Sequence, residues 1–218
     1  MKIKPWFLYW VKENSGKKPT REIEITENGT YNVTNYATAN VNIPITNNAK
    51  VITVMENPAS GFLGKKFLVE LPVIDMNNMS AMTNLFLQCN NLEKIEGIIN
   101  TSSVTNMTEC FENCYKLKKI PYFDTSNVTA MASSFRSCSI LETIPLLNTA
   151  KVINMANTFY DSPNLSDETL NNILKMCAIA TRVSSGKSLD SIGLSSTQIN
   201  RCKTLSNYQE FLDAGWTA

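Results

Sequence analysis

The sequence predicts an α+β protein: a solenoid of about four stacked coils of 24–25 residues, with a β module before it and a helical C-terminal cap after it. The main observation is a repeat of Met, Phe, Cys, Leu and Ile at fixed intervals. Apolar and polar residues alternate before the repeat, and apolar residues take helical spacing after it. The matching positions are Met82, Phe86, Cys89, Leu92 and Ile95; Met107, Phe111, Cys114, Leu117 and Ile120; Met131, Phe135, Cys138, Leu141 and Ile144; and Met155, Phe159, Ser162 and Leu165.

The apolar positions of the repeat are expected to face inward. One coil of this length has too few apolar side chains to close a core of its own, so each coil must cover the next. Burying five or six such side chains contributes on the order of 8–15 kcal/mol per coil before chain entropy is subtracted. Several coils and two end caps are therefore needed.

Each coil is expected to hold three kinds of segment. Residues 92–98, 117–123 and 141–147 should be extended and form a narrow parallel sheet. Residues 100–107 and 124–131 are rich in Asn, Asp, Ser and Thr, which favour turns. The spacing of Met107, Phe111 and Cys114 predicts one helical or 3₁₀ turn on the convex side.

The chain divides into four regions at changes of pattern. Residues 1–19 are an aromatic N-terminal segment, 20–58 a small β module, 59–165 the solenoid and 166–218 the cap. Alternating residues predict short antiparallel strands in the β module, with an Asn-Gly turn at residues 27–30. The cap should contain helices over about 166–180, 196–205 and 207–214, the first opened by Ser166 and the last ended by Gly215.

The repeated motif Thr-Ser-x-Val-Thr-x-Met followed by Phe-x-x-Cys-x-x-Leu-x-x-Ile-Pro resembles the BspA-type leucine-rich repeats of bacterial surface proteins and mycoplasma lipoproteins. This resemblance covers residues 71–165 and implies a leucine-rich-repeat solenoid used for interaction. Residues 24–43 and 205–216 resemble stretches of structural proteins from phages and prophages of Firmicutes. Together they imply a phage or prophage protein.

Composition argues against several functional classes. The chain has no histidine, which removes the commonest general base and the usual zinc ligand. Its net charge is +1 and no long basic run occurs, so nucleic-acid binding has little support. No segment approaches the ~20 apolar residues of a membrane span and no secretory signal is recognisable. We therefore expect a protein that is not an enzyme, uses no cofactor or metal, and resides in a virion or the host cytoplasm.

Isolated motifs have structural interpretations. We expect the six cysteines to be core thiols, because three of them occupy one repeat position. Asp75, Asp124 and Asn148 lie near strand ends, where turn capping is favoured over calcium binding. Gly61-Phe-Leu-Gly-Lys-Lys66 lacks the spacing of a phosphate loop and is expected to be a turn.

The predicted function is recognition of a host or virion protein, or of a cell-surface glycan, through the repeat surface. The strand-face residues expected to point outward and bind this partner are Glu93, Lys94, Glu96, Lys118, Lys119, Tyr122, Glu142 and Thr143. The alternatives are a structural component of a phage tail or baseplate and an intracellular inhibitor of a host defence protein. The structural alternative predicts a homo-oligomer formed through the aromatic N-terminus, at Trp6, Phe7, Tyr9 and Trp10.

Overall fold

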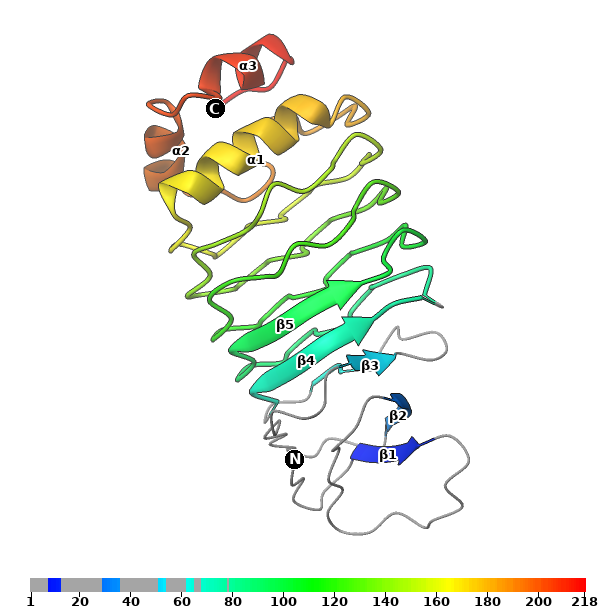
Figure 1. Cartoon of the computed structure of the whole chain (residues 1–218). Coiled ribbons are helices and arrows are strands. Elements are labelled where there is room, and N and C mark those ends of the chain that lie inside the picture. The colour runs from blue at the N-terminus through cyan, green and yellow to red at the C-terminus, as the bar shows by residue number, and fades with distance from the viewer. Residues whose placement is uncertain (1–7, 13–28, 36–50, 54–61, 65–67, 78) are drawn as a thin grey trace.

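A computed structural model describes residues 8–12, 29–35, 51–53, 62–64, 68–77 and 79–218. Successive turns of the chain stack on one another, and three helices lie at the C-terminal end of the stack (Figure 1). The strands are β1 (Leu8–Lys12), β2 (Gly29–Asn35), β3 (Val51–Thr53), β4 (Glu70–Asp75) and β5 (Lys94–Ile99). The helices are α1 (Asp167–Ile179), α2 (Ser196–Cys202) and α3 (Tyr208–Asp213).

The strands form one sheet in chain order, and most of its pairs are parallel. Among the described strands, β1 and β2 pair antiparallel, whereas β2–β3, β3–β4 and β4–β5 are all parallel. The prediction of an antiparallel module is therefore wrong for the pair β2–β3. Each parallel partner follows after roughly one coil, as Glu70 with Lys94 shows, because a parallel pair needs a long return connection. Residues 20–28, which include the start of the expected Asn-Gly turn, lie outside the described residues.

Beyond β5 the extended segments pair only at isolated points. Residues 117–123 and 141–147 were expected to continue the parallel sheet. In the described chain these two segments are joined by a single isolated parallel bridge, between Lys119 and Thr143. Pro121 and Pro145 occupy equivalent places in these two coils. Proline has no backbone N–H, so both coils lack a ladder donor at the same level.

The convex side is built from tandem turns, and the predicted helical or 3₁₀ turn is wrong. Within one coil, Cys110 N–H donates to the Met107 carbonyl at 3.0 Å, and Cys114 N–H donates to that of Phe111 at 3.1 Å. Intervening N–H groups reach the next coil instead, as Phe111 does to Ser134 at 2.8 Å. Glu109 adopts a left-handed φ of 56°, which a helix would not allow.

Two columns of left-handed residues run along this convex side. Equivalent residues in all four coils have φ between 54° and 63°, where L-residues are rare. The first column is Asn84, Glu109, Ser133 and Asn157, and the second is Gln88, Asn113, Ser137 and Asp161. This repeated conformation allows alternate N–H groups to point along the stack.

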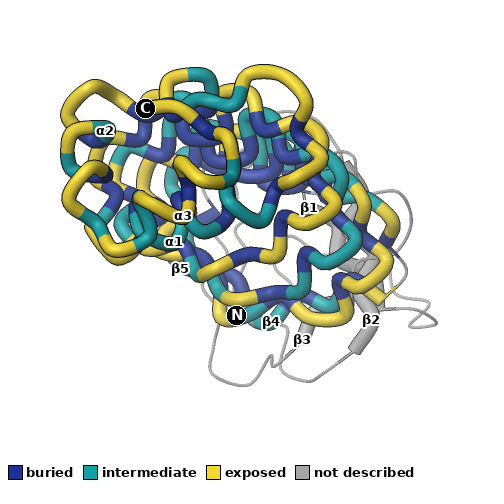
Figure 2. Tube along the Cα trace, turned by 90° about the horizontal axis from the view of Figure 1, so that it is seen from above, coloured by how far each residue is buried: buried dark blue, intermediate teal, exposed yellow. Residues whose placement is uncertain are grey.

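The core is continuous along the stack, and the inward placement of the repeat positions is confirmed. Five phenylalanine rings are stacked with centroids 5.1–5.9 Å apart and planes within 16° of parallel. Viewed along the stack, buried positions line the inside of the superposed coils (Figure 2). The rings belong to Phe62, Phe86, Phe111, Phe135 and Phe159, all fully buried.

The prediction of core thiols is also confirmed, since all six cysteines are buried and none of them forms a disulfide. The Cys114 thiol donates to the Phe86 carbonyl at 3.2 Å and the Cys138 thiol to that of Phe111 at 3.1 Å. Ser162 takes the same place in the next coil and donates to Phe135 at 2.7 Å. Burial raises the pKa of Cys138 to about 12, so this thiol stays protonated at neutral pH.

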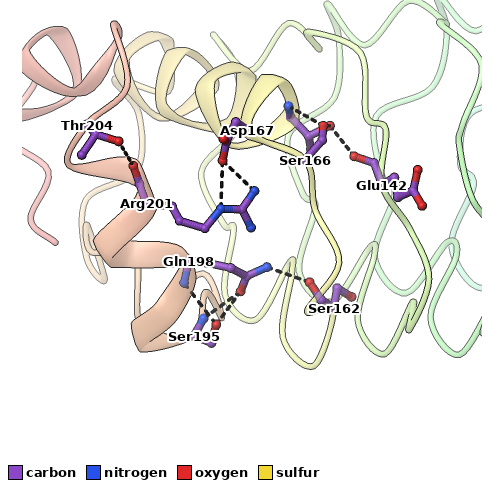
Figure 3. A network of polar contacts seen from close by, with 9 residues as sticks. Glu142, Ser162, Ser166, Asp167, Ser195, Gln198, Arg201 and Thr204 are labelled. Carbon is purple, nitrogen blue, oxygen red and sulfur yellow. Dashed lines mark hydrogen bonds and ion pairs between the residues drawn. The ribbon is translucent and has the colours of Figure 1, made fainter.

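Helix α1 closes the last coil with its side chains. Ser166 caps the helix by accepting from the Thr169 N–H at 3.1 Å, and Leu170 and Ile173 are buried against the core. The Thr169 hydroxyl donates to the Glu142 carbonyl at 2.7 Å and accepts from the Ile144 N–H at 3.0 Å. Figure 3 shows Ser166 at the start of α1, beside Glu142 of the last coils. The Ser166 N–H also donates to the Glu142 carbonyl at 3.1 Å, so one backbone group and the Thr169 side chain replace the backbone of a further coil.

The predicted helices of the cap are present with shorter bounds. Helix α2 ends at Cys202 instead of residue 205, and α3 begins at Tyr208. Ser195 and Gln198 form a capping box at the start of α2. Gly215 has φ of 81° after α3, the conformation expected of a residue that ends a helix.

Candidate interaction surface

The outward side of the extended segments forms a surface that we call the strand face, comprising residues 93–96, 118–122 and 142–146. None of the eight partner-binding residues expected from the sequence is buried. Lys94 and Glu142 are half-buried, and the other six are exposed. The expected outward orientation of these side chains is therefore confirmed, whereas their role in binding stays a prediction.

Backbone contacts place the charged residues of successive coils side by side. The N–H groups of Glu93 and Lys94 both donate to the Val69 carbonyl, at 2.8 and 3.3 Å. Two coils further, the N–H groups of Glu142 and Thr143 donate to the Lys118 carbonyl, at 2.9 and 3.2 Å. The same register therefore recurs, and it brings residues 118–119 next to residues 142–143.

Most of the charged side chains of the strand face form two ion pairs. Lys94 lies 2.5 Å from Glu96, and Lys118 lies 3.3 Å from Glu142. The hydrogen bond and charge of Glu96 raise the pKa of Lys94. Because these side chains are about half exposed, solvent screens both pairs and each adds little to stability. Lys119 has no ion-pair partner among the described residues, so its charge remains available.

Tyr122 is the most exposed large apolar side chain of the described chain, with 68% of its surface accessible. Lys119 bridges to Thr143, so Tyr122 and Leu146, three residues further on, occupy equivalent positions on neighbouring coils. Leu146 is 42% exposed. Leu146 was not among the residues predicted to bind a partner, although its position one repeat after Tyr122 was a usable signal.

The N-terminal oligomerisation candidates are only partly described. Trp6 and Phe7 lie outside the described residues. Tyr9 and Trp10 belong to β1, and their backbones pair with Thr34 and Val33 of β2. This pairing places the segment at the end of the described strand order.

The prediction of turn capping at the strand ends is confirmed. Asp75 accepts hydrogen bonds from the Asn77 N–H and the Asn100 side chain, both at 2.9 Å. Asp124 accepts from the Ser126 N–H at 2.8 Å, and Asn148 plays the same part for Ala150. The residues described contain no group of three potential metal ligands.

Comparisons with known proteins identify one matching family. Residues 60–181 match the model of a family described as "Mycoplasma protein of unknown function, DUF285". The match runs from the coil of Phe62 through the end of α1. No curated protein and no solved structure matches the chain significantly. Of the helices in the described residues, none has the length and apolar character needed to cross a bilayer.

Proposed function

This chain belongs to the DUF285 family of mycoplasma proteins of unknown function, and from that premise we propose that it is a non-enzymatic protein that binds a partner protein through its strand face. The observation that carries the proposal is the exposure of Tyr122 beside Leu146 and Lys119. Tyrosine is one of the residue types that most often carry the binding energy of protein interfaces. The ion-paired residues around them supply a polar rim.

The architecture is part of the same proposal. We interpret the stacked coils as a leucine-rich-repeat solenoid of the BspA type, with α1 to α3 as its cap. The stacked Phe ladder and the register that recurs every 24–25 residues support this interpretation. A phage or prophage origin rests only on the resemblance of residues 24–43 and 205–216.

The chemistry of the chain supports a binding role over catalysis. There is no histidine, and burial raises the pKa of Cys110, Cys114, Cys138, Cys177 and Cys202. A thiol nucleophile needs a lowered pKa and access to substrate, and these thiols have the opposite properties.

The test compares two double variants that remove the same side chains from different faces of one coil. Lys119→Ala/Tyr122→Ala alters the strand face, whereas Lys116→Ala/Tyr115→Ala alters an exposed corner. Immobilised wild type and both variants are used to capture proteins from lysates of low-GC Gram-positive bacteria and mycoplasmas, with quantitative mass spectrometry. We expect the strand-face variant alone to lose a captured protein at least tenfold, at an unchanged melting temperature. Equal capture by all three proteins would refute the proposal.

A structural virion component is the second candidate, and the position of β1 at the end of the strand order favours it. A terminal strand offers an edge to which a second copy could add. Light scattering after size exclusion would compare the full chain with one that starts at Thr20. A multimer that becomes a monomer on truncation would support this candidate, and a monomeric full chain would exclude assembly through β1.

A further inference from the structure

A cavity of about 480 Å³ lies between the last coil and the segment that leads into α2. This is within the ~300–1,000 Å³ range of small-molecule sites in proteins. One wall comes from residues 157–163 on the convex side of the coil, and the other from residues 190–198. The cavity therefore belongs to the column of tandem turns and is separate from the strand face.

The two walls are fixed to each other by backbone contacts. Asn157 N–H donates to the Ser191 carbonyl at 2.9 Å, and Phe159 N–H donates to that of Ile192 at 2.8 Å. Gly193 packs against the backbone of Tyr160 so closely that only glycine can stand there. Such walls need little reordering when a ligand enters, which lowers the entropic cost of binding.

A buried amide forms part of the lining. Gln198 is only 2% exposed and reaches from α2 to the Ser162 carbonyl, to which it donates at 2.8 Å (Figure 3). Its carbonyl oxygen accepts from the Ser195 N–H at 3.0 Å. These bonds fix Gln198 and Ser195 in the cavity wall, because neither end of the amide is free to rotate.

The lining combines acceptors, donors and one aromatic ring. The exposed residues Asp161 and Asp190 belong to opposite walls, and no lysine or arginine is among the lining residues. One carboxylate oxygen of Asp161 also accepts from the Ser137 hydroxyl at 3.2 Å. The Ser196 hydroxyl and the Asn157 amide supply donors, whereas the Ser195 hydroxyl donates to the Gln198 carbonyl oxygen at 2.9 Å. Tyr160 is 51% exposed, and the Arg136 guanidinium lies over its ring, 5.3 Å from the centroid. Anionic ligands are disfavoured here, and a simple cation would leave the donors unused.

We propose that this cavity is a binding site for a neutral hexopyranose, either free or as a terminal unit of a glycan. Sugar hydroxyls both donate and accept, so they satisfy the carboxylates and the Ser and Asn donors together. The apolar C–H face of the sugar ring packs on the face of the Tyr160 ring opposite Arg136. The site lies away from the strand face, so it is independent of the proposed protein recognition.

The test is a titration of the isotope-labelled full chain, followed by backbone amide chemical shifts. The ligands are glucose, galactose, mannose and N-acetylglucosamine, each with spermidine and inorganic phosphate as comparison ligands. A dissociation constant on the order of 1 mM is expected for the preferred sugar. Its perturbed amides should be those of residues 157–163 and 190–198, two segments far apart in sequence.

Matched variants then separate binding from folding. Asp161→Asn/Asp190→Asn keeps the shape of both side chains, and asparagine tolerates the left-handed φ of 57° at residue 161. This variant should bind the sugar about tenfold more weakly or worse, since each lost bond had a charged acceptor. Asp213→Asn, an exposed change on α3, should leave binding unchanged.

Three outcomes would overturn the proposal. No response to any of the four sugars at tens of millimolar would exclude a hexopyranose site. Perturbations centred on residues 118–122 would place binding on the strand face. A response of the cavity to spermidine but not to sugars would make it a cation site.

Discussion

The Cys138 N–H donates a 3.0 Å hydrogen bond to the hydroxyl of Ser162, which holds the cysteine position in the next coil. Both side chains also donate to the phenylalanine carbonyl of the preceding coil, at 3.1 Å from Cys138 and 2.7 Å from Ser162. Serine and cysteine therefore perform the same task in this column. The buried Ser162 hydroxyl is fully hydrogen-bonded, because it accepts from the Cys138 N–H and donates to the Phe135 carbonyl.

We predict that Cys138→Ser is mild and Cys138→Ala is costly. Serine keeps the donor to the Phe111 carbonyl, and its expected cost is below about 1 kcal/mol. Alanine removes that bond and leaves a small cavity, so its cost should be about 1–3 kcal/mol. Urea unfolding of the two variants measures the difference. Equal losses would show that the bond to Phe111 contributes nothing.

Which side chains face inward could be predicted from the sequence, because burial follows residue type and spacing. Phe111 and Cys114 recur every 24–25 residues, and both are buried. The turn conformation between Met107 and Cys114 could not be predicted this way. A spacing of three to four residues suits a helix, but it equally suits tandem turns whose N–H groups reach the next coil.

The strand face could likewise be anticipated, since its residues alternate with buried ones along each coil. The cavity could not, because it joins Tyr160 to Gly193 across more than thirty residues. No sequence pattern in either segment indicates that the two segments are in contact. The contact arises only when the chain after α1 folds back on the last coil.

In the left-handed column that contains Ser133, substitution by glycine is predicted to change stability in opposite directions at two neighbouring residues. Ser133 has φ of 54°, whereas Ala132 does not have a positive φ. Ser133→Gly should be neutral or stabilising by up to about 1 kcal/mol, because relief of αL strain outweighs or matches the added chain entropy. Ala132→Gly should destabilise by about 0.5–1 kcal/mol. Thermal and urea unfolding would measure both, and equal effects would contradict the argument.

Thr169 gives a prediction about how α1 closes the stack. Thr169→Val keeps the shape but removes the hydroxyl, which leaves the buried Ile144 N–H without an acceptor. The expected cost is about 1–3 kcal/mol in urea unfolding. Thr197→Val, an exposed change on α2, is the control and should stay within about 0.5 kcal/mol. A cost at Thr169 as small as at Thr197 would mean that the strand edge needs no cap.

The buried thiols make stability fall at alkaline pH. Burial raises the pKa of Cys138 from 9.0 to about 12, while the unfolded chain ionises near the unshifted value. Between these values the folded state holds the proton and the unfolded state releases it, so the free energy of unfolding decreases as pH rises. Each such thiol contributes a slope of about −1.4 kcal/mol per pH unit in this window and none well below pH 9.

Comparing wild type with Cys138→Ser isolates one thiol from all other groups that titrate in the same range. The serine hydroxyl does not ionise, so the variant should lose stability less steeply above pH 9. The difference in unfolding free energy between the two proteins, measured in urea at pH 8, 9, 10 and 11, should therefore shift in favour of the variant by roughly 1.4 kcal/mol per unit at the top of this range. Because the Cys138 thiol donates to Phe111, ionisation in the folded state would also break that bond. If the difference in unfolding free energy stayed constant across all four pH values, Cys138 would ionise equally in the folded and unfolded chains. Burial would then not raise its pKa.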